Sequence, residues 1–187
     1  MAPATKTLWL LRHAKTVTEP PPGGSDFDRV LAPRGRRDAT ALGTRFAGSG
    51  KGLPSELRRA PRPDVALISP AARTSATADL VLAEVDSPPK RRLTEELYRA
   101  DPQDVLEMLA NLNDDIGAAM VVGHNPTAQA LSLGLIDPAD KKGCALASTA
   151  GFPTCALGVY SFAIDHWSDI DGRSAKLLGL VTPPYDD

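Results

Sequence analysis

The sequence is poor in cysteine, in net charge and in long apolar runs. Its 187 residues include only two cysteines, Cys144 and Cys155, which is too few for a disulfide framework, so we expect reduced thiols. The net charge of -2 creates no global field that would draw the chain to nucleic acid or to an anionic membrane. No apolar run approaches the roughly 18 residues that cross a bilayer, and the apolar part of the first segment is too short for a signal peptide. These absences predict a cytoplasmic protein with no nucleic-acid or membrane partner.

The bulk composition is that of an ordinary globular protein. Hydrophobic residues make up 42% of the chain and charged residues 24%. This length suits one domain, which we expect to span residues 1–187. The three histidines, His13, His124 and His166, lack the spacing of metal ligands, so we expect no metal and no cofactor.

Short apolar runs that alternate with helical patterns predict an α/β fold. The predicted strands cover 7–11, 64–69, 118–123, 155–162 and 175–181. The first three runs are apolar on both faces, which is typical of buried parallel strands. Helical patterns cover 34–47 and 71–84, and two more helices begin near 101 and 125. Proline and glycine mark 18–26 and 48–63 as surface loops.

Basic side chains and imidazoles follow the first three predicted strands. Arg12 and His13 end the first run, Arg73 lies one turn into the helix after the second, and His124 follows the third. In open α/β sheets, ligands bind beyond the carboxyl ends of neighbouring strands. We therefore expect these two guanidiniums and two imidazoles to share one pocket.

The chemistry of this quartet favours phosphate. Arginine forks match phosphate oxygens in a bidentate way, and an imidazole among them can attack phosphorus. Ser69 and Asn125, each followed by a proline, are predicted helix N-caps, and helix N-termini attract anions. Neither cysteine begins the C-x5-R motif of a cysteine phosphatase. The "DFDRV" segment, 26–30, follows a proline- and glycine-rich loop and not a strand, which argues against a haloacid dehalogenase-type phosphatase.

Several motifs together resemble the histidine phosphatase superfamily, the phosphoglycerate mutase-like proteins, and within it the SixA-type phosphohistidine phosphatases. They are "LLRHAKT", "DFDRVLAPRGRRDATALG", "ISPAARTSATA", "LYRADPQDVLEML" and "VVGHNPTA". The resemblance implies a three-layer α/β/α sandwich with a mostly parallel central sheet and no metal requirement. It implies that His13 is the nucleophile and that Arg12, Arg73 and His124 hold the transferred phosphoryl group. Ala14 and Ala76 stand where many superfamily members carry glycine and glutamine.

The substrate and the proton donor are less defined. Larger superfamily members use a glutamate as the acid, and Glu95 lies at about the right place in "LTEELY". Lys15 and Asn125, which adjoin the quartet in sequence, are candidate substrate-binding residues. An imidazole leaving group needs less protonation than an alkoxide, so a phosphohistidine phosphatase can work without a strong acid. The predicted partner is a phosphohistidine protein or a small phosphorylated metabolite.

Two other functions fit the same residues. One is a broad-specificity phosphomonoesterase that acts on metabolites, and the other is a non-catalytic phosphate-binding module.

Overall fold

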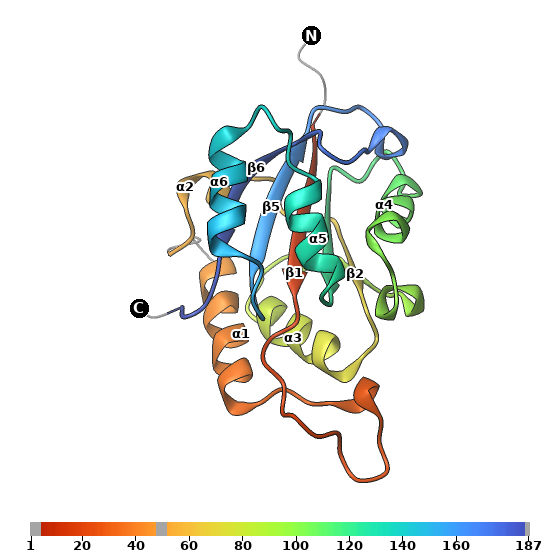
Figure 1. Ribbon diagram of the computed structural model, residues 1–187, viewed down its shortest axis with the longest axis vertical. Coiled ribbons are helices and arrows are strands. Elements are labelled where there is room, and N and C mark those ends of the chain that lie inside the picture. Colours follow the sequence, from red (N-terminus) through yellow and green to blue (C-terminus); the bar gives the residue numbers. More distant parts are fainter. Residues whose placement is uncertain (1–4, 48–51, 186–187) are drawn as a thin grey trace.

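The computed structural model describes residues 5–47 and 52–185, which form one six-stranded sheet in the order β3-β2-β4-β1-β5-β6 (Figure 1). The strands are β1 (Lys6–Arg12), β2 (Val65–Ile68), β3 (Lys90–Leu93), β4 (Ala118–Gly123), β5 (Leu157–Phe162) and β6 (Ala175–Val181). β4 pairs in parallel with both β1 and β2, as expected for three strands that are buried on both faces. β5 and β6 add an antiparallel edge, so the sheet is mostly parallel.

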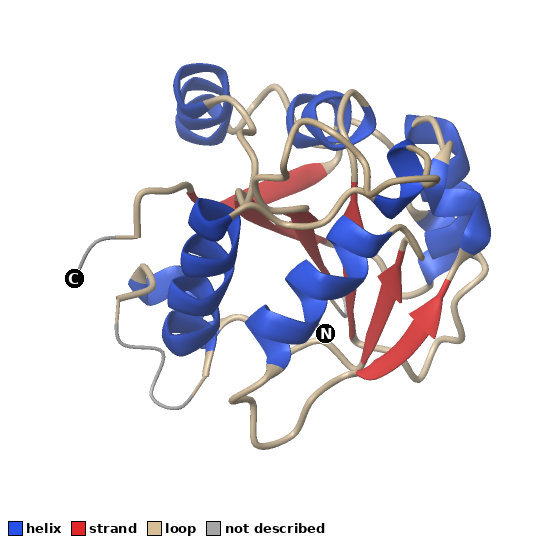
Figure 2. Ribbon diagram, turned by 90° about the horizontal axis from the view of Figure 1, so that it is seen from below, coloured by secondary structure: helices blue, strands red, loops and turns tan. Residues whose placement is uncertain are grey.

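Helices cover both faces of this sheet, which confirms the predicted α/β/α layers (Figure 2). The helices are α1 (Pro33–Phe46), α2 (Ser55–Arg59), α3 (Ala72–Leu82), α4 (Pro102–Ala110), α5 (Thr127–Gly134) and α6 (Lys141–Ala150). Along β1, Leu8 and Leu10 join the core under α4 and α5, while Trp9 and Leu11 join the core under α1 and α3. Each fully buried leucine contributes about 1.5–3 kcal/mol. β1 is therefore held from both sides, which fixes the position of its last residues.

The structure differs from the sequence expectations in three elements. β3 was not expected, because all four residues of "KRRL" are exposed and no apolar run marks this edge strand. α2 lies inside the predicted loop 48–63, where Leu57 is its only buried residue; 48–51 lie outside the described residues. α6 was also not expected, although the Asp140 side chain caps it by accepting the N–H of Gly143.

Short 3-10 helices shape the connections. They are η1 (Asp26–Asp28), η2 (Glu95–Tyr98) and η3 (Trp167–Asp169). η1 lies within the long loop that leaves β1 at the foot of the molecule in Figure 1. Among the helices of the described ranges, none is long and apolar enough to cross a membrane.

Candidate active site

The carboxyl ends of β2, β4 and β1 lie side by side and bring the predicted imidazoles and Arg73 together. The ring centroids of His13 and His124 are 5.3 Å apart. Arg73, which is buried on α3, donates from Nε to Nδ1 of His124 over 3.2 Å. Residues separated by more than a hundred positions thus form one cluster because parallel strands end at the same edge.

The backbone holds His13 rigidly. Its N–H donates to the carbonyl of Gly123 at the end of β4, and its own carbonyl accepts the N–H of Cys155, both over 3.0 Å. The ring Nδ1 donates to the carbonyl of Ala14 over 2.9 Å. Because a neutral imidazole carries one proton, this bond leaves a lone pair on Nε2, to which no described residue donates a hydrogen bond.

The surroundings of His13 keep it neutral. Burial, reinforced by the positive charges of Arg73 and Arg12, lowers the pKa of His13 to about 4, against the opposing effect of the Ala14 carbonyl. At neutral pH its Nε2 is therefore unprotonated. This is the state that attack on phosphorus requires.

Arg12 is the last residue of β1 and directly precedes His13. Its Nη1 donates to the carbonyl of Phe152 over 2.9 Å, which ties the guanidinium to the segment after α6. Its Nε is buried and finds no hydrogen-bond partner among the described residues. A buried guanidinium N–H that is not used by the protein fits a site for an anion.

Both ring nitrogens of His124 are engaged by the protein. Nδ1 accepts from Arg73, so the proton is on Nε2, which donates to the Ser69 hydroxyl over 2.8 Å. Burial and then the charge of Arg73 lower the pKa of His124 to about 3. The prediction that Ser69 is a helix N-cap is wrong, since α3 begins after Ala71 and the hydroxyl points to His124 instead.

A carboxylate that the sequence analysis did not include joins this cluster. Arg73 donates from Nη1 to the main-chain carbonyl of Asp26 over 2.6 Å and from Nη2 to the Asp26 carboxylate over 3.0 Å. In the sequence, Asp26 begins both the "DFDRV" segment, which resembles a nucleophile motif of another family, and the longer "DFDRVLAPRGRRDATALG" motif, but neither assigns it a role. The segment forms η1 and not the end of a strand.

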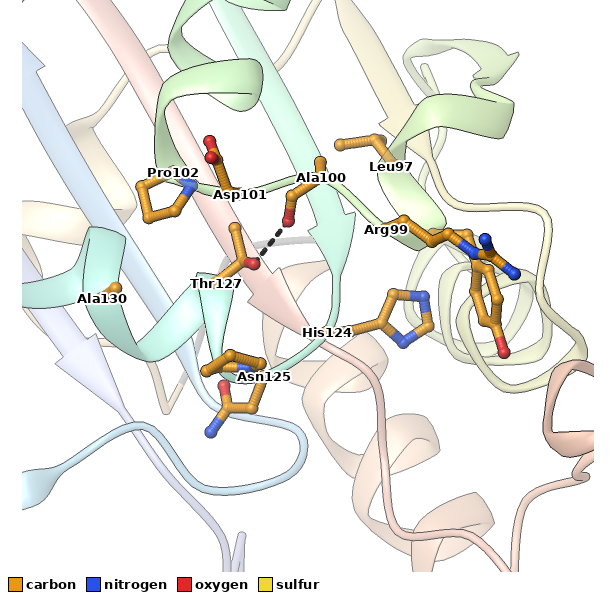
Figure 3. A pocket seen from close by; sticks show the side chains of 11 residues that line it. Leu97, Arg99, Ala100, Asp101, Pro102, His124, Asn125, Thr127 and Ala130 are labelled. Carbon is orange, nitrogen blue, oxygen red and sulfur yellow. Dashed lines mark hydrogen bonds between the residues drawn. The ribbon is translucent and has the colours of Figure 1, made fainter.

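A cavity of about 270 Å³ opens beside His124, between the segment 97–102 and the start of α5 (Figure 3). Asn125 and Arg99 line it, and the Thr127 hydroxyl closes one wall by donating to the carbonyl of Ala100 over 2.6 Å. Asn125 also accepts the N–H of Gln129 in the first turn of α5, although that helix begins after Pro126. A substrate group larger than phosphate can occupy this cavity.

Two other predicted site residues lie further out. Lys15 is exposed. Its main-chain carbonyl accepts a hydrogen bond from the Ala32 N–H, which connects the two ends of the loop between β1 and α1. Glu95 begins η2 with an exposed side chain and does not line the cavity beside His124. In the ranges 5–47 and 52–185, no group of three or more histidine, cysteine, aspartate or glutamate side chains is placed to hold a metal ion.

The sequence relatives of this chain cover nearly its whole length. No protein-family model matches it. A protein of Mycobacterium tuberculosis that is itself uncharacterized is 33% identical over 174 residues, which is 92% of this chain and 99% of that protein. An uncharacterized protein of Mycobacterium leprae is 30% identical over 175 residues, again 92% of this chain and 99% of that protein.

Solved structures identify the fold. A candidate phosphohistidine phosphatase SixA from Nakamurella multipartitia matches with a TM-score of 0.76 and 29% identity, over 97% of this chain and 99% of that one. A candidate SixA from Agrobacterium tumefaciens matches with a TM-score of 0.70 and 26% identity, over 95% of this chain and 98% of that one. The chain therefore has the fold of the histidine phosphatase superfamily, the phosphoglycerate mutase-like proteins, and its structural neighbours include SixA-type proteins.

Proposed function

We propose that residues 1–187 act as one phosphatase domain that hydrolyses protein phosphohistidine through a phosphohistidine intermediate on His13. One observation carries the proposal: the Nδ1 proton of His13 is bound to the Ala14 carbonyl, and Nε2 is left as a neutral nucleophile beside two guanidiniums. The candidate SixA structures support the substrate class, because they are named for phosphohistidine.

The reaction has two displacement steps. His13 Nε2 attacks phosphorus, the bond from phosphorus to the substrate nitrogen breaks, and its electron pair returns to the leaving imidazole. Water then attacks the phosphorylated His13, and the electron pair of the second bond returns to Nε2, which frees inorganic phosphate. Arg12 and Arg73 stabilise the charge on the equatorial oxygens in both steps.

His124 acts in this scheme through Arg73. Its Nδ1 accepts the Nε proton of Arg73, which sets the plane of the guanidinium that faces the phosphoryl group. Glu95 and Lys15 have no required step, while Asn125 contacts the substrate beyond the phosphoryl group, in the cavity beside His124.

The test compares phosphate release from a phosphohistidine peptide and from p-nitrophenyl phosphate, both in EDTA. His13→Ala should lower release by at least about a thousandfold. The matched control is His166→Ala, which removes an exposed histidine paired with Asp114 and should change nothing. A base-stable, acid-labile phosphoenzyme should form in the wild type and in His166→Ala but not in His13→Ala.

Three results would contradict the proposed function and indicate another one or another mechanism. Ester hydrolysis equal to or faster than phosphohistidine hydrolysis would indicate a broad-specificity phosphomonoesterase. Tight binding of inorganic phosphate without turnover would indicate a phosphate-binding module. Loss of activity in EDTA that added metal restores would contradict the metal-independent mechanism.

A further inference from the structure

Asp26 is fixed by three side chains from separate parts of the chain. Its Oδ2 accepts hydrogen bonds from Arg73 Nη2 over 3.0 Å and from the Tyr98 hydroxyl over 3.1 Å. Its Oδ1 accepts from Arg29 Nη1 over 2.9 Å. Arg29 is itself anchored to the loop after His13, since its Nη2 donates to the Thr16 hydroxyl over 2.6 Å. A carboxylate with this many donors has a defined position, unlike an ordinary loop aspartate.

The position of Asp26 is at the rim of the candidate active site. The Arg73 side chain is 8% exposed, whereas the Asp26 side chain, in direct contact with it, is 55% exposed. In an in-line displacement, the leaving group is on the side of phosphorus opposite the attacking nitrogen. Arg73 is the inner member of this ion pair and Asp26 the outer one, so a leaving group that departs from the Arg73-bound phosphoryl group toward solvent would pass the Asp26 carboxylate.

This carboxylate is ionised and is a poor proton donor. The hydrogen bond from Arg29, with smaller contributions from Arg73 and Tyr98, lowers the pKa of Asp26 to about 2, in spite of the opposing effect of burial. At neutral pH it therefore cannot protonate the oxygen of an ester leaving group. Its charge offsets the positive charges of Arg29 and Arg73, so the place is more favourable to a cationic leaving group, and less favourable to an anionic one, than it would be without the carboxylate.

We propose that Asp26 determines leaving-group specificity: it favours substrates whose leaving group is a protonated nitrogen heterocycle or amine, and it disfavours leaving groups that depart as anions. This inference rests on the proposed function of the same site and names its substrate class as phosphoramidates.

The chemical step balances without an acid from the protein. The imidazole of phosphohistidine can carry a proton on the ring nitrogen that is not bonded to phosphorus. Asp26 stabilises this imidazolium, and attack by His13 Nε2 breaks the bond between phosphorus and nitrogen. The electron pair returns to the ring, and neutral imidazole leaves with its proton. An alkoxide would leave as an anion near the Asp26 charge and would gain no proton from it.

The decisive variant is Asp26→Asn, which keeps an oxygen acceptor for Arg73 but removes the charge. We expect kcat/KM for a phosphohistidine peptide to fall about five- to tenfold, while kcat/KM for p-nitrophenyl phosphate is unchanged or rises. Asp28→Asn is the matched control, since Asp28 lies in the same exposed turn but accepts only from Ser25. It should leave both values unchanged.

The outcomes separate this inference from the proposed function. An equal fall for both substrates in Asp26→Asn would mean that Asp26 only positions Arg73, and it would overturn the inference while leaving the phosphatase intact. A wild type that hydrolyses neither substrate would refute the proposed function and the inference with it.

A second measurement varies the charge of the leaving group. Phenyl phosphates that carry a trimethylammonium or a carboxylate group differ in charge and also in the reactivity of the phenol, so the ratio of their rates is compared between the wild type and Asp26→Asn. The ratio of cationic to anionic compound should be about five- to tenfold higher in the wild type. Equal ratios in the two proteins would contradict the role of Asp26.

Discussion

Arg73 and His124 are joined by a hydrogen bond from guanidinium Nε to imidazole Nδ1, across 51 positions of sequence. This bond fixes the His124 tautomer, because a nitrogen that accepts from a permanently protonated guanidinium cannot carry a proton itself. The proton of the ring is therefore on Nε2, which donates a hydrogen bond to the Ser69 hydroxyl. The cluster therefore has one neutral imidazole that is engaged at both nitrogens and one, His13, whose Nε2 is open to a substrate.

The first prediction is that two of the three histidines do not titrate near neutral pH. Because the pKa values of His13 and His124 are lowered to about 4 and about 3, their imidazole NMR signals should stay still between pH 8 and 5.5. The signal of His166 should move in this range, since its hydrogen bond to Asp114 raises its pKa. In His166→Ala the moving signal should vanish. A second signal with a midpoint between 6 and 7 would contradict the buried, neutral state of the cluster.

The same shifts predict how stability depends on pH. A histidine whose folded pKa is lowered binds more protons in the unfolded chain between its ordinary value of 6.5 and about 4. Its contribution to the free energy of unfolding is therefore constant above 6.5 and decreases as the pH falls through that window. Urea unfolding at pH 7.5, 6 and 5 should show a smaller decrease for His13→Gln, whose side chain does not titrate, than for the wild type. An identical pH dependence of the free energy of unfolding in both proteins would show that His13 does not contribute to it.

Thr77 links the two halves of the site. Its hydroxyl oxygen accepts the Ala14 N–H over 2.9 Å and donates to the Arg73 carbonyl over 2.6 Å. Thr77→Val keeps the shape but leaves a buried N–H unpaired, so we expect a loss of about 1–3 kcal/mol in unfolding free energy. The turnover number should also fall, because Ala14 orients the His13 ring through its carbonyl. Thr77→Ser keeps the hydroxyl and should have a turnover number close to that of the wild type. A turnover number as low as that of Thr77→Val would show that loss of the hydroxyl does not explain the fall.

The fold was predictable where the sequence carries a strong apolar signal. The runs at the centre of the sheet marked β1, β2 and β4, and Asp101 with Pro102 marked the start of α4. β3 could not be found this way, because an edge strand needs no apolar residues when its backbone pairs on one side only. The grouping of the quartet could also be predicted, because the carboxyl ends of neighbouring parallel strands lie at the same edge of the sheet whatever the contacts of their side chains.

The contacts around the quartet depend on tertiary detail that no sequence pattern carried. Serine is a common N-cap residue, but the Ser69 hydroxyl accepts a hydrogen bond from His124 Nε2 instead. Asp26 lies in a motif that resembles the superfamily, but its position at the site depends on contacts with Arg29 and Tyr98, which no sequence pattern predicts. These hydrogen bonds form only because the folded chain brings separate loops together at the strand ends.

The last prediction concerns Gly35, whose lack of a side chain lets α1 approach the loop after His13. A Cβ at this position would lie 2.0 Å from the Lys15 carbonyl oxygen, which belongs to backbone and cannot move away cheaply. Alanine in a helix is normally better than glycine by about 0.5–1 kcal/mol. Here the clash should reverse the sign, so that Gly35→Ala costs about 1–3 kcal/mol and displaces the segment that carries Ala14 and His13.

Two glycine variants separate the effect on the site from the effect on packing. Gly43 is also buried in α1, and Gly43→Ala would place a Cβ 2.6 Å from the Leu80 carbonyl oxygen on α3, not against the loop after His13. It should lower the melting temperature like Gly35→Ala but keep the turnover number of the folded protein. Gly134→Ala, at the end of α5, has open space around its Cβ, so it should not lower the melting temperature and should keep the turnover number. A displaced Ala14 carbonyl would no longer hold the Nδ1 proton of His13, which would reduce attack from Nε2. Gly35→Ala should therefore lower the turnover number as well as the melting temperature. A lower melting temperature with full turnover per folded molecule would show that the loop after His13 does not depend on this contact.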